Sequence, residues 1–198
     1  FATFKAQINE DPLGRAKNVK EEIDFFLNRE EYTHIFNRAL ANNEIPLKVT
    51  HNDTKLNNVL LDKETRKPLC VIDLDTVMPG LCLYDYGDSI RFGASTALED
   101  EKDLSKVSMS LDLYKIYTKG YISALPNLTK EEKEYLPLGA KTMTFECGLR
   151  FLTDYIDGDN YFAIHREGHN LDRARTQFKL VADMEAKWDE MKKVVMEL

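Results

Sequence analysis

The side chains best suited to chemistry lie in two short segments of the 198-residue sequence, THNDTKLNN at 50–58 and VIDLD at 71–75. In both segments polar residues flank apolar runs that are typical of short strands. Asp53 follows the first of three such runs, Asn58 opens the second, and Asp73 closes the third. This spacing predicts that two carboxylates and one amide belong to a single site.

The runs at 58–61 and 69–72 predict a β-hairpin, because a turn-like segment separates them. The base of that hairpin would bring Asn58 and Asp73 together, and the loop before it would place Asp53 beside them. Such an arrangement suits phosphoryl transfer, a reaction that depends on positioning and charge neutralisation more than on covalent chemistry.

Each of these three residues has a distinct expected role. Asp53 would orient an acceptor hydroxyl and accept its proton as the catalytic base. Asn58 and Asp73 would hold Mg²⁺, which prefers hard oxygen ligands. One amide and one carboxylate can fill that role without loading the metal with negative charge.

The elements that must position this site are mostly helical. Residues 1–17 are expected to be irregular, because Pro12 and Gly14 interrupt any periodicity. Apolar residues at helical spacing then run from a capping residue at Asn18 to about Asn42. A helical region is therefore predicted before the first strand.

After a β insertion near residues 47–73, helical periodicity resumes and continues to the end of the chain. One apolar stripe runs over 104–125, Thr129 and Glu132 form a capping-box pattern, and one last helix is expected across 174–195. The sequence predicts an α+β, mostly helical fold whose small β-hairpin insertion carries the chemically active loops.

Composition narrows the range of partners. Lys and Arg total 27 against 34 Asp and Glu, which gives a net charge of −7. Binding to nucleic acid usually requires a basic face, so neither nucleic acid nor an anionic membrane is expected as a partner. No apolar run approaches the roughly 20 residues that span a bilayer. Three cysteines without a Cys-x-x-Cys pair are typical of reduced thiols, and we expect a cytoplasmic protein.

The His-x-Asp at 51–53, with Asn58 and Asp73 at their separations, resembles the catalytic and metal-binding loops of the aminoglycoside phosphotransferase and choline kinase superfamily. The longer string at 50–88 resembles the corresponding part of the N-acetylhexosamine 1-kinases. With further matches downstream, the resemblance covers about residues 48–182.

The resemblance implies the C-terminal lobe of a protein-kinase-like fold, with the catalytic and metal loops at 50–88 and a helical substrate region at 89–198. It implies ATP as phosphoryl donor, Mg²⁺ as cofactor and a small sugar as acceptor. The sugar would contact Arg150, Tyr161 and Phe92.

The reaction implied is phosphorylation of the anomeric hydroxyl of an N-acetylhexosamine. An aminoglycoside kinase or a choline or other amino-alcohol kinase is the alternative within the same class. Two other classes stay open: an inactive kinase-like binding module, and a metal-dependent hydrolase that uses the same carboxylates.

Four further polar residues are expected to support the loops. In the family, the position of His51 braces the catalytic loop by packing and hydrogen bonds. Asp75 stands where protein kinases have glycine, and is expected to brace the loop or to contact a second metal ion. Asp85 and Asp88 precede a helix, where they would cap it and anchor the loop.

A kinase of this type also needs a lobe that covers the phosphates. No glycine-rich or Walker pattern occurs in the sequence, and the chain opens at Phe1. We therefore expect the whole of 1–198 to be the C-terminal lobe, with the N-terminal nucleotide lobe absent from this chain. Alone, it is expected to bind ATP and Mg²⁺ weakly and to phosphorylate nothing.

Overall fold

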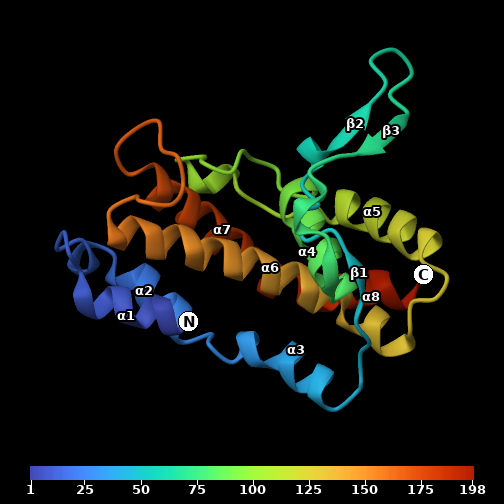
Figure 1. Cartoon of the computed structure of the whole chain (residues 1–198), viewed down its shortest axis with the longest axis horizontal. Coiled ribbons are helices and arrows are strands. Elements are labelled where there is room, and N and C mark those ends of the chain that lie inside the picture. The colour runs from blue at the N-terminus through green and yellow to red at the C-terminus, as the bar shows by residue number, and fades with distance from the viewer.

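The computed structural model describes all residues 1–198 and confirms the predicted α+β, mostly helical fold (Figure 1). The helices are α1 (Ala2–Glu10), α2 (Lys20–Leu27), α3 (Tyr32–Ala41), α4 (Cys82–Gly93), α5 (Leu111–Ala124), α6 (Lys130–Asp157), α7 (His169–Ala186) and α8 (Trp188–Met196). The strands are β1 (Lys48–Thr50), β2 (Val59–Leu61), β3 (Pro68–Val71) and β4 (Met78–Gly80). Short 3₁₀ turns connect them, among them η2 (Leu56–Asn58) and η3 (Leu74–Thr76).

Helix α6 is the longest element and the centre of the helical body (Figure 1). It begins with the predicted capping box, in which the Thr129 hydroxyl accepts from the Glu132 N–H and the Glu132 carboxylate accepts from the Thr129 N–H. The helix packs most extensively against α4 and α7 and takes part in both apolar cores. The body is therefore organised around a single 28-residue helix.

The four strands form two separate antiparallel pairs. Strands β2 and β3 make the predicted hairpin, and the turn between them is closed by the Asp62 carboxylate. Strand β1 pairs with β4, which the sequence did not predict, because Met78-Pro79-Gly80 has little strand character. This second pair joins the two ends of the loop region immediately before α4 begins.

Several local predictions were wrong. Residues 2–10 form α1, which packs on α6, rather than irregular chain. Asn18 does not cap the next helix, since α2 has Val19 at its N-cap position. The stripe at 104–125 is divided between a 3₁₀ turn and α5, and the last helical region breaks at Lys187 into α7 and α8.

Helices α4 and α6 approach each other closely enough to require glycine on both. A Cβ on Gly139 of α6 would lie 2.7 Å from the carbonyl oxygen of Leu83, and a Cβ on Gly87 would collide with the carbonyl oxygen of Gly139. This close approach fixes the first turn of α4 on the body. The candidate site is anchored on that turn.

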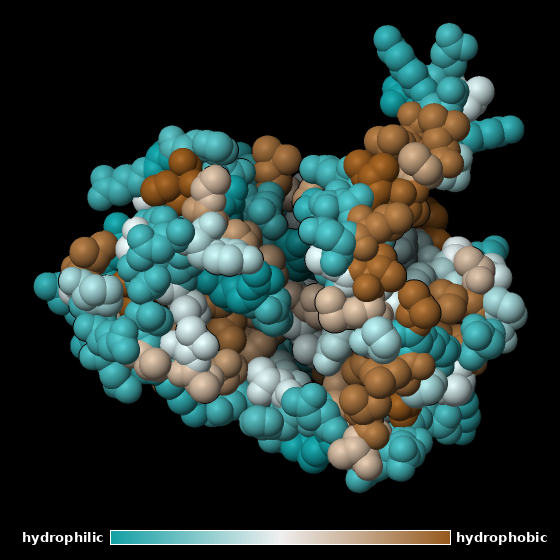
Figure 2. All heavy atoms as spheres, viewed as in Figure 1, coloured by the Kyte–Doolittle hydropathy of each residue, from teal (hydrophilic) through white to brown (hydrophobic).

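The loop region at 47–80 carries an unusual amount of exposed apolar surface, which Figure 2 shows extending from the hairpin down the adjoining side. The exposed apolar residues are Leu47, Val49, Leu56, Leu60, Leu61, Leu69, Val71, Ile72, Leu74, Val77 and Met78. Isolated exposed apolar residues are ordinary, but a contiguous group of this kind marks an interaction surface. None of the helices is long and apolar enough to span a membrane.

Candidate active site

The loop after β1 is anchored by a carboxylate from α4. The two oxygens of Asp85 accept the backbone N–H groups of His51 and Asn52 at 2.8 and 2.7 Å. A second link lies nearby, because the Thr54 hydroxyl donates to the Asp85 carbonyl at 2.6 Å. Asn52 has a positive φ of 64°, and these contacts hold it there.

His51 joins the loop to the far side of the hairpin. Its Nδ1 accepts the N–H of Asp53 at 3.2 Å, and its Nε2 lies 2.9 Å from the carbonyl oxygen of Ile72. An acceptor at Nδ1 requires the proton to be on Nε2, so the ring donates to Ile72 in its neutral form. Both ring nitrogens are occupied, which leaves His51 a bracing contact and no free nitrogen for proton transfer.

Asp53 is held by two side chains through one of its oxygens. Lys55 Nζ and Asn58 Nδ2 donate to Asp53 Oδ2 at 2.7 and 2.8 Å, and Oδ1 makes no hydrogen bond. Partial burial raises the pKa of Asp53, but the hydrogen bonds from Lys55 and Asn58 outweigh it and hold the pKa below its usual value. Asp53 is therefore a carboxylate with one oxygen available to a ligand.

Lys55 lies in the same motif, but the sequence did not predict a role for it. Its hydrogen bond to Asp53 raises its pKa, and the nearby charges of Asp73 and Asp88 add to that effect. Lys55 therefore pairs with Asp53, and two further carboxylate charges act on it from a greater distance. The signal in the sequence was a lysine two residues after the expected base.

Asn58 and Asp73 both lie at the base of the hairpin, where the N–H of Ile72 donates to the Asn58 carbonyl at 2.9 Å. Asn58 is buried and uses its amide nitrogen on Asp53, so its amide oxygen has no protein partner. Asp73 is exposed, adopts a left-handed conformation with φ 64°, and makes no side-chain hydrogen bond. The two free oxygen donors lie next to Asp53 and Lys55.

The other two aspartates behave differently from each other. Asp88 pairs with Arg91 at 2.9 Å on α4 and contributes to the field around Lys55. Asp75 is exposed and makes no hydrogen bond or ion pair, so the expected bracing by Asp75 has no support in the structure. Asp85 does more than the predicted helix capping, because its carboxylate accepts two backbone N–H groups of the loop.

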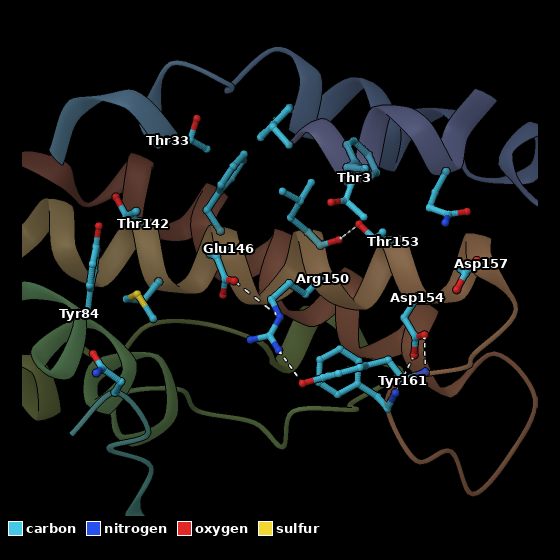
Figure 3. A pocket seen from close by; sticks show the side chains of 18 residues that line it. Thr3, Thr33, Tyr84, Thr142, Glu146, Arg150, Thr153, Asp154, Asp157 and Tyr161 are labelled. Carbon is cyan, nitrogen blue, oxygen red and sulfur yellow. Dashed lines mark hydrogen bonds and ion pairs between the residues drawn. The ribbon is translucent and has the colours of Figure 1, made fainter. Parts of the chain in front are cut away.

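Beside this loop lies a cavity of about 850 Å³, walled by α1, α6 and the chain after α6 (Figure 3). Asn52 lines one part of it, and Arg150 and Tyr161 line another. Arg150 lies 3.6 Å from Glu146 and 3.5 Å from the Tyr161 hydroxyl, and Figure 3 shows the three side chains in a row. The structure thus brings Arg150 and Tyr161 into one cavity with a neighbour of Asp53.

Two carboxylates shape this row. Protein atoms around Glu146 desolvate its carboxyl and raise its pKa against the opposing charges of Arg150 and Arg91. Asp154 is buried and accepts the N–H groups of Tyr161 and Phe162 at 2.8 and 2.9 Å. Asp154 therefore fixes the chain that presents Tyr161. The sequence suggested Asp154 only as a partner of Arg150, four residues away on the same helix.

Phe92 does not belong to this cavity. It lies in the last turn of α4 and lines a different hollow, formed with residues 95–101 and α7. The expectation that Phe92 adds a second wall to the sugar site was wrong, because the sequence could not reveal which side of α4 its ring would occupy.

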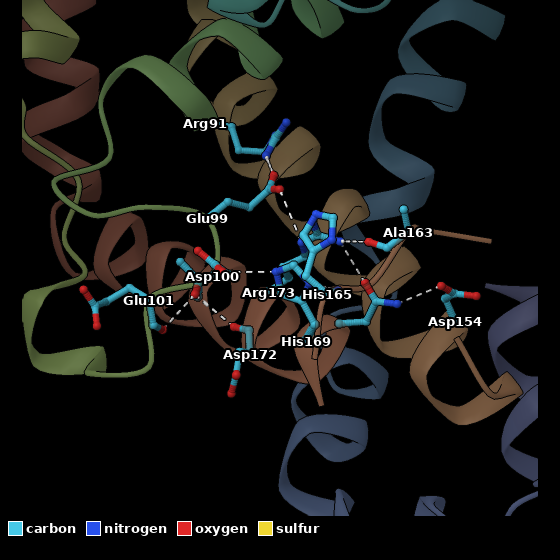
Figure 4. A network of polar contacts seen from close by, with 12 residues as sticks. Arg91, Glu99, Asp100, Glu101, Asp154, Ala163, His165, His169, Asp172 and Arg173 are labelled. Carbon is cyan, nitrogen blue, oxygen red and sulfur yellow. Dashed lines mark hydrogen bonds and ion pairs between the residues drawn. The ribbon is translucent and has the colours of Figure 1, made fainter. Parts of the chain in front are cut away.

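The same hollow borders a network of ion pairs (Figure 4). His169 is buried, with Nδ1 accepting the His165 N–H and Nε2 3.1 Å from Asp100. Arg166 joins Asp100 to Asp172, and Arg91 pairs with Glu99. His165 and His169 therefore contribute hydrogen bonds and packing to this network.

A family model described as the phosphotransferase enzyme family matches residues 6–104. The chain belongs to this phosphotransferase family. The matched part of the phosphotransferase contains the anchored loop, the hairpin and the first turn of α4, and with them Asp53, Asn58, Asp73 and Asp85. Arg150 and Tyr161 lie beyond the matched residues.

Proposed function

We propose that this chain is the catalytic lobe of an ATP-dependent kinase that phosphorylates the anomeric hydroxyl of an N-acetylhexosamine. Membership of the phosphotransferase family gives the class of reaction. The observation that carries the choice of acceptor is the shared cavity, because it extends from Asn52, next to Asp53, to Arg150 and Tyr161.

The lining of the cavity suits a neutral sugar with an acetamido group. Arg150 offers planar N–H donors and Glu146 offers acceptors one helical turn away. Tyr161 adds an aromatic face, and 75% of its surface is accessible to a ligand. A pyranose ring needs hydrogen bonds at fixed positions and an aromatic or apolar wall, and both are supplied here.

Asp53 would act as the base. Its Oδ1 is free to accept the proton of the acceptor hydroxyl, while Lys55 and Asn58 hold Oδ2 and keep the carboxyl ionised. An anomeric hydroxyl is more acidic than other sugar hydroxyls, which makes it a suitable partner for a carboxylate. Asp85 contributes by fixing the backbone of His51 and Asn52, just before Asp53.

The donor set at the hairpin base fits magnesium. The free amide oxygen of Asn58 and the exposed carboxylate of Asp73 are both hard oxygen ligands, and they are too few to enclose the ion. Nucleotide phosphates and water would supply the other ligands. Magnesium bound with ATP supplies neutralisation of the phosphate charge during transfer.

The exposed apolar surface at 47–78 supports the proposal that a nucleotide-covering lobe packs on this face. Without such a cover the phosphates would remain in water, where the electrostatic interactions that stabilise transfer are weak. We accordingly propose that residues 1–198 alone bind the sugar but do not phosphorylate it.

An amino-sugar or amino-alcohol kinase is the second candidate. One observation favours it: Glu146, Asp154 and Asp157 all line the cavity against the single cation of Arg150. A cationic acceptor would be attracted to that lining. Asp154 is already occupied by backbone N–H groups, however, which reduces the charge that a cation would meet.

Binding to the 198-residue chain separates these candidates, because the cavity that holds Arg150 and Tyr161 is formed by residues of this chain. Calorimetric titrations would compare N-acetylglucosamine, N-acetylgalactosamine, kanamycin and choline. We expect heat from the acetylated sugars only, and Arg150→Ala should weaken their binding about tenfold, since one lost hydrogen bond to a buried ligand costs about 1–3 kcal/mol.

The matched control is Arg38→Ala, an exposed arginine on α3 that pairs with Glu31 outside the cavity. That variant should bind the sugar as well as the unmodified chain. Preference for kanamycin or choline would replace the acceptor, and sugar binding that survives Arg150→Ala would reject the assigned cavity.

A further inference from the structure

Lys141 on α6 differs from every other buried charged residue of the chain. Its side chain is only 6% exposed, yet it makes no hydrogen bond and no ion pair. The remaining buried charges all have partners, as when Glu132 pairs with Lys48 and Glu22 with Arg175. Its nitrogen is not fully enclosed, because it opens on a hollow at the surface where no protein oxygen meets it. A polar group that is almost buried favours any ligand that can supply such an oxygen.

Two aromatic rings account for part of that environment. The ammonium nitrogen lies 3.8 Å from the centroid of the Tyr32 ring and 4.4 Å from that of Trp188. Such contacts stabilise the cation, but they supply no hydrogen-bond acceptor for its three N–H groups. Glu185 is the nearest source of negative charge, and its carboxylate is used by Arg29 and by the Tyr32 hydroxyl.

Lys141 also lines a cavity of about 500 Å³ that shares no residue with the cavity beside Arg150. Two further donors line it without using their N–H groups, the indole of Trp188 and the side-chain amide of Asn28. Three side chains with unused N–H donors therefore line one hollow between α3, α6 and α8, and Asn28 is exposed there.

We propose that this cavity is a binding site for a small carboxylate, held by the Lys141 ammonium group with the Trp188 and Asn28 N–H groups. The charged side chains around it are two cations, Lys141 and Arg29, and one carboxylate, Glu185. One positive charge is left over, which matches a monoanion. A dianionic phosphate would bring a second negative charge next to Glu185.

Charge linkage supports this assignment. Burial lowers the pKa of Lys141, and the charge of Arg29 lowers it further against the opposing effect of Glu185. A bound carboxylate favours the protonated form and supplies the missing acceptor. The site is independent of the proposed sugar kinase activity, because it requires neither Asp53 nor Arg150.

Trp188 is the only tryptophan of the chain, so its fluorescence reports on this cavity without a label. The experiment titrates the 198-residue chain with sodium acetate at constant ionic strength, with sodium chloride and sodium phosphate as parallel arms. We expect a saturable change with acetate and a weaker response in the other two arms. Lys141→Met keeps the unbranched apolar stem of the side chain without its ammonium group, and should weaken acetate binding at least about tenfold.

Lys130→Met is the control, because Lys130 lies on the same helix with 82% of its side chain exposed. It should bind acetate as the unmodified chain does. Acetate binding that persists in Lys141→Met, or a stronger response to phosphate or chloride than to acetate, would overturn the proposal. If Lys141→Met does not unfold cooperatively, Trp188→Phe followed by calorimetry decides instead: binding should weaken about threefold or more, and unchanged binding rejects the site.

Discussion

The loop region at 47–80 and the helix α6 are built on different physical principles. In the loop region only Thr50 and Asn58 are buried, and the apolar side chains face outward. Helix α6 buries most of one side along its length, including Leu136, Phe145 and Leu152. The first region carries the residues expected to do chemistry, and the second provides the cohesion that holds the molecule together.

The difference shows how a site can be ordered without a core of its own. The loop is held by directed hydrogen bonds, above all from the Asp85 carboxylate on α4. Helix α4 is in turn fixed to α6 by the close approach at Gly87 and Gly139. The apolar core therefore holds α6, the close approach at Gly87 and Gly139 holds α4 on α6, and the Asp85 hydrogen bonds hold the loop on α4.

The largest expected effect on the loop side is chemical. In the phosphotransferase with its nucleotide-covering lobe present, Asp53→Asn should reduce turnover by about two to four orders of magnitude, the scale for removal of a positioned base. The measurement is steady-state transfer from ATP to N-acetylglucosamine. Folding should change little, because the pair between Asp53 and Lys55 is partly exposed and such pairs contribute little.

Glu64→Gln is the matched control, since Glu64 is exposed in the turn of the same hairpin and its side chain makes no contact. It should retain nearly full turnover. Activity above a tenth of the unmodified enzyme in Asp53→Asn would show that another group accepts the proton.

A leucine-to-alanine substitution should reduce the free energy of unfolding much more in α6 than in the hairpin. Leu152 of α6 is fully buried, so Leu152→Ala should lower the free energy of unfolding by about 2–5 kcal/mol. Leu60 in the hairpin is 45% exposed, and Leu60→Ala should change it by no more than about 0.5 kcal/mol. Denaturant unfolding of the 198-residue chain measures both values. Equal losses would mean that the hairpin contributes to the core.

The sequence was most informative where contacts are local. Asn58 lies five residues after Asp53, and a hairpin between short apolar runs was enough to predict that they meet. The capping box of α6 was predictable for the same reason, because Thr129 and Glu132 are three residues apart. In both cases the partners are set by backbone geometry over a few residues.

Contacts that depend on packing were not predictable in this way. The hydrogen bonds from the loop to Asp85 join residues more than thirty positions apart in the sequence. They form only when α4 lies against β1 and β4. Phe92 was misassigned because the side of α4 that faces the sugar cavity is decided by the crossing at Gly87. Lys141 gave no signal, since one lysine in a helix does not reveal that aromatic rings will enclose it.

The smallest expected effect concerns the link between the two regions. Asp85→Ala removes both acceptors of the His51 and Asn52 N–H groups, and hydrogen bonds to a charged group are worth about 1.5–3 kcal/mol each. Part of that loss is regained from water, because the loop lies at the surface. Amide hydrogen exchange should therefore become about tenfold or more faster at His51 and Asn52, while the cooperative unfolding of the helical body is almost unchanged.

Asp75→Ala is the control for this measurement and should leave exchange at both amides as it is. Exchange that speeds up equally along α6 would show that the loop and the body unfold as one unit, and the comparison between them would fail.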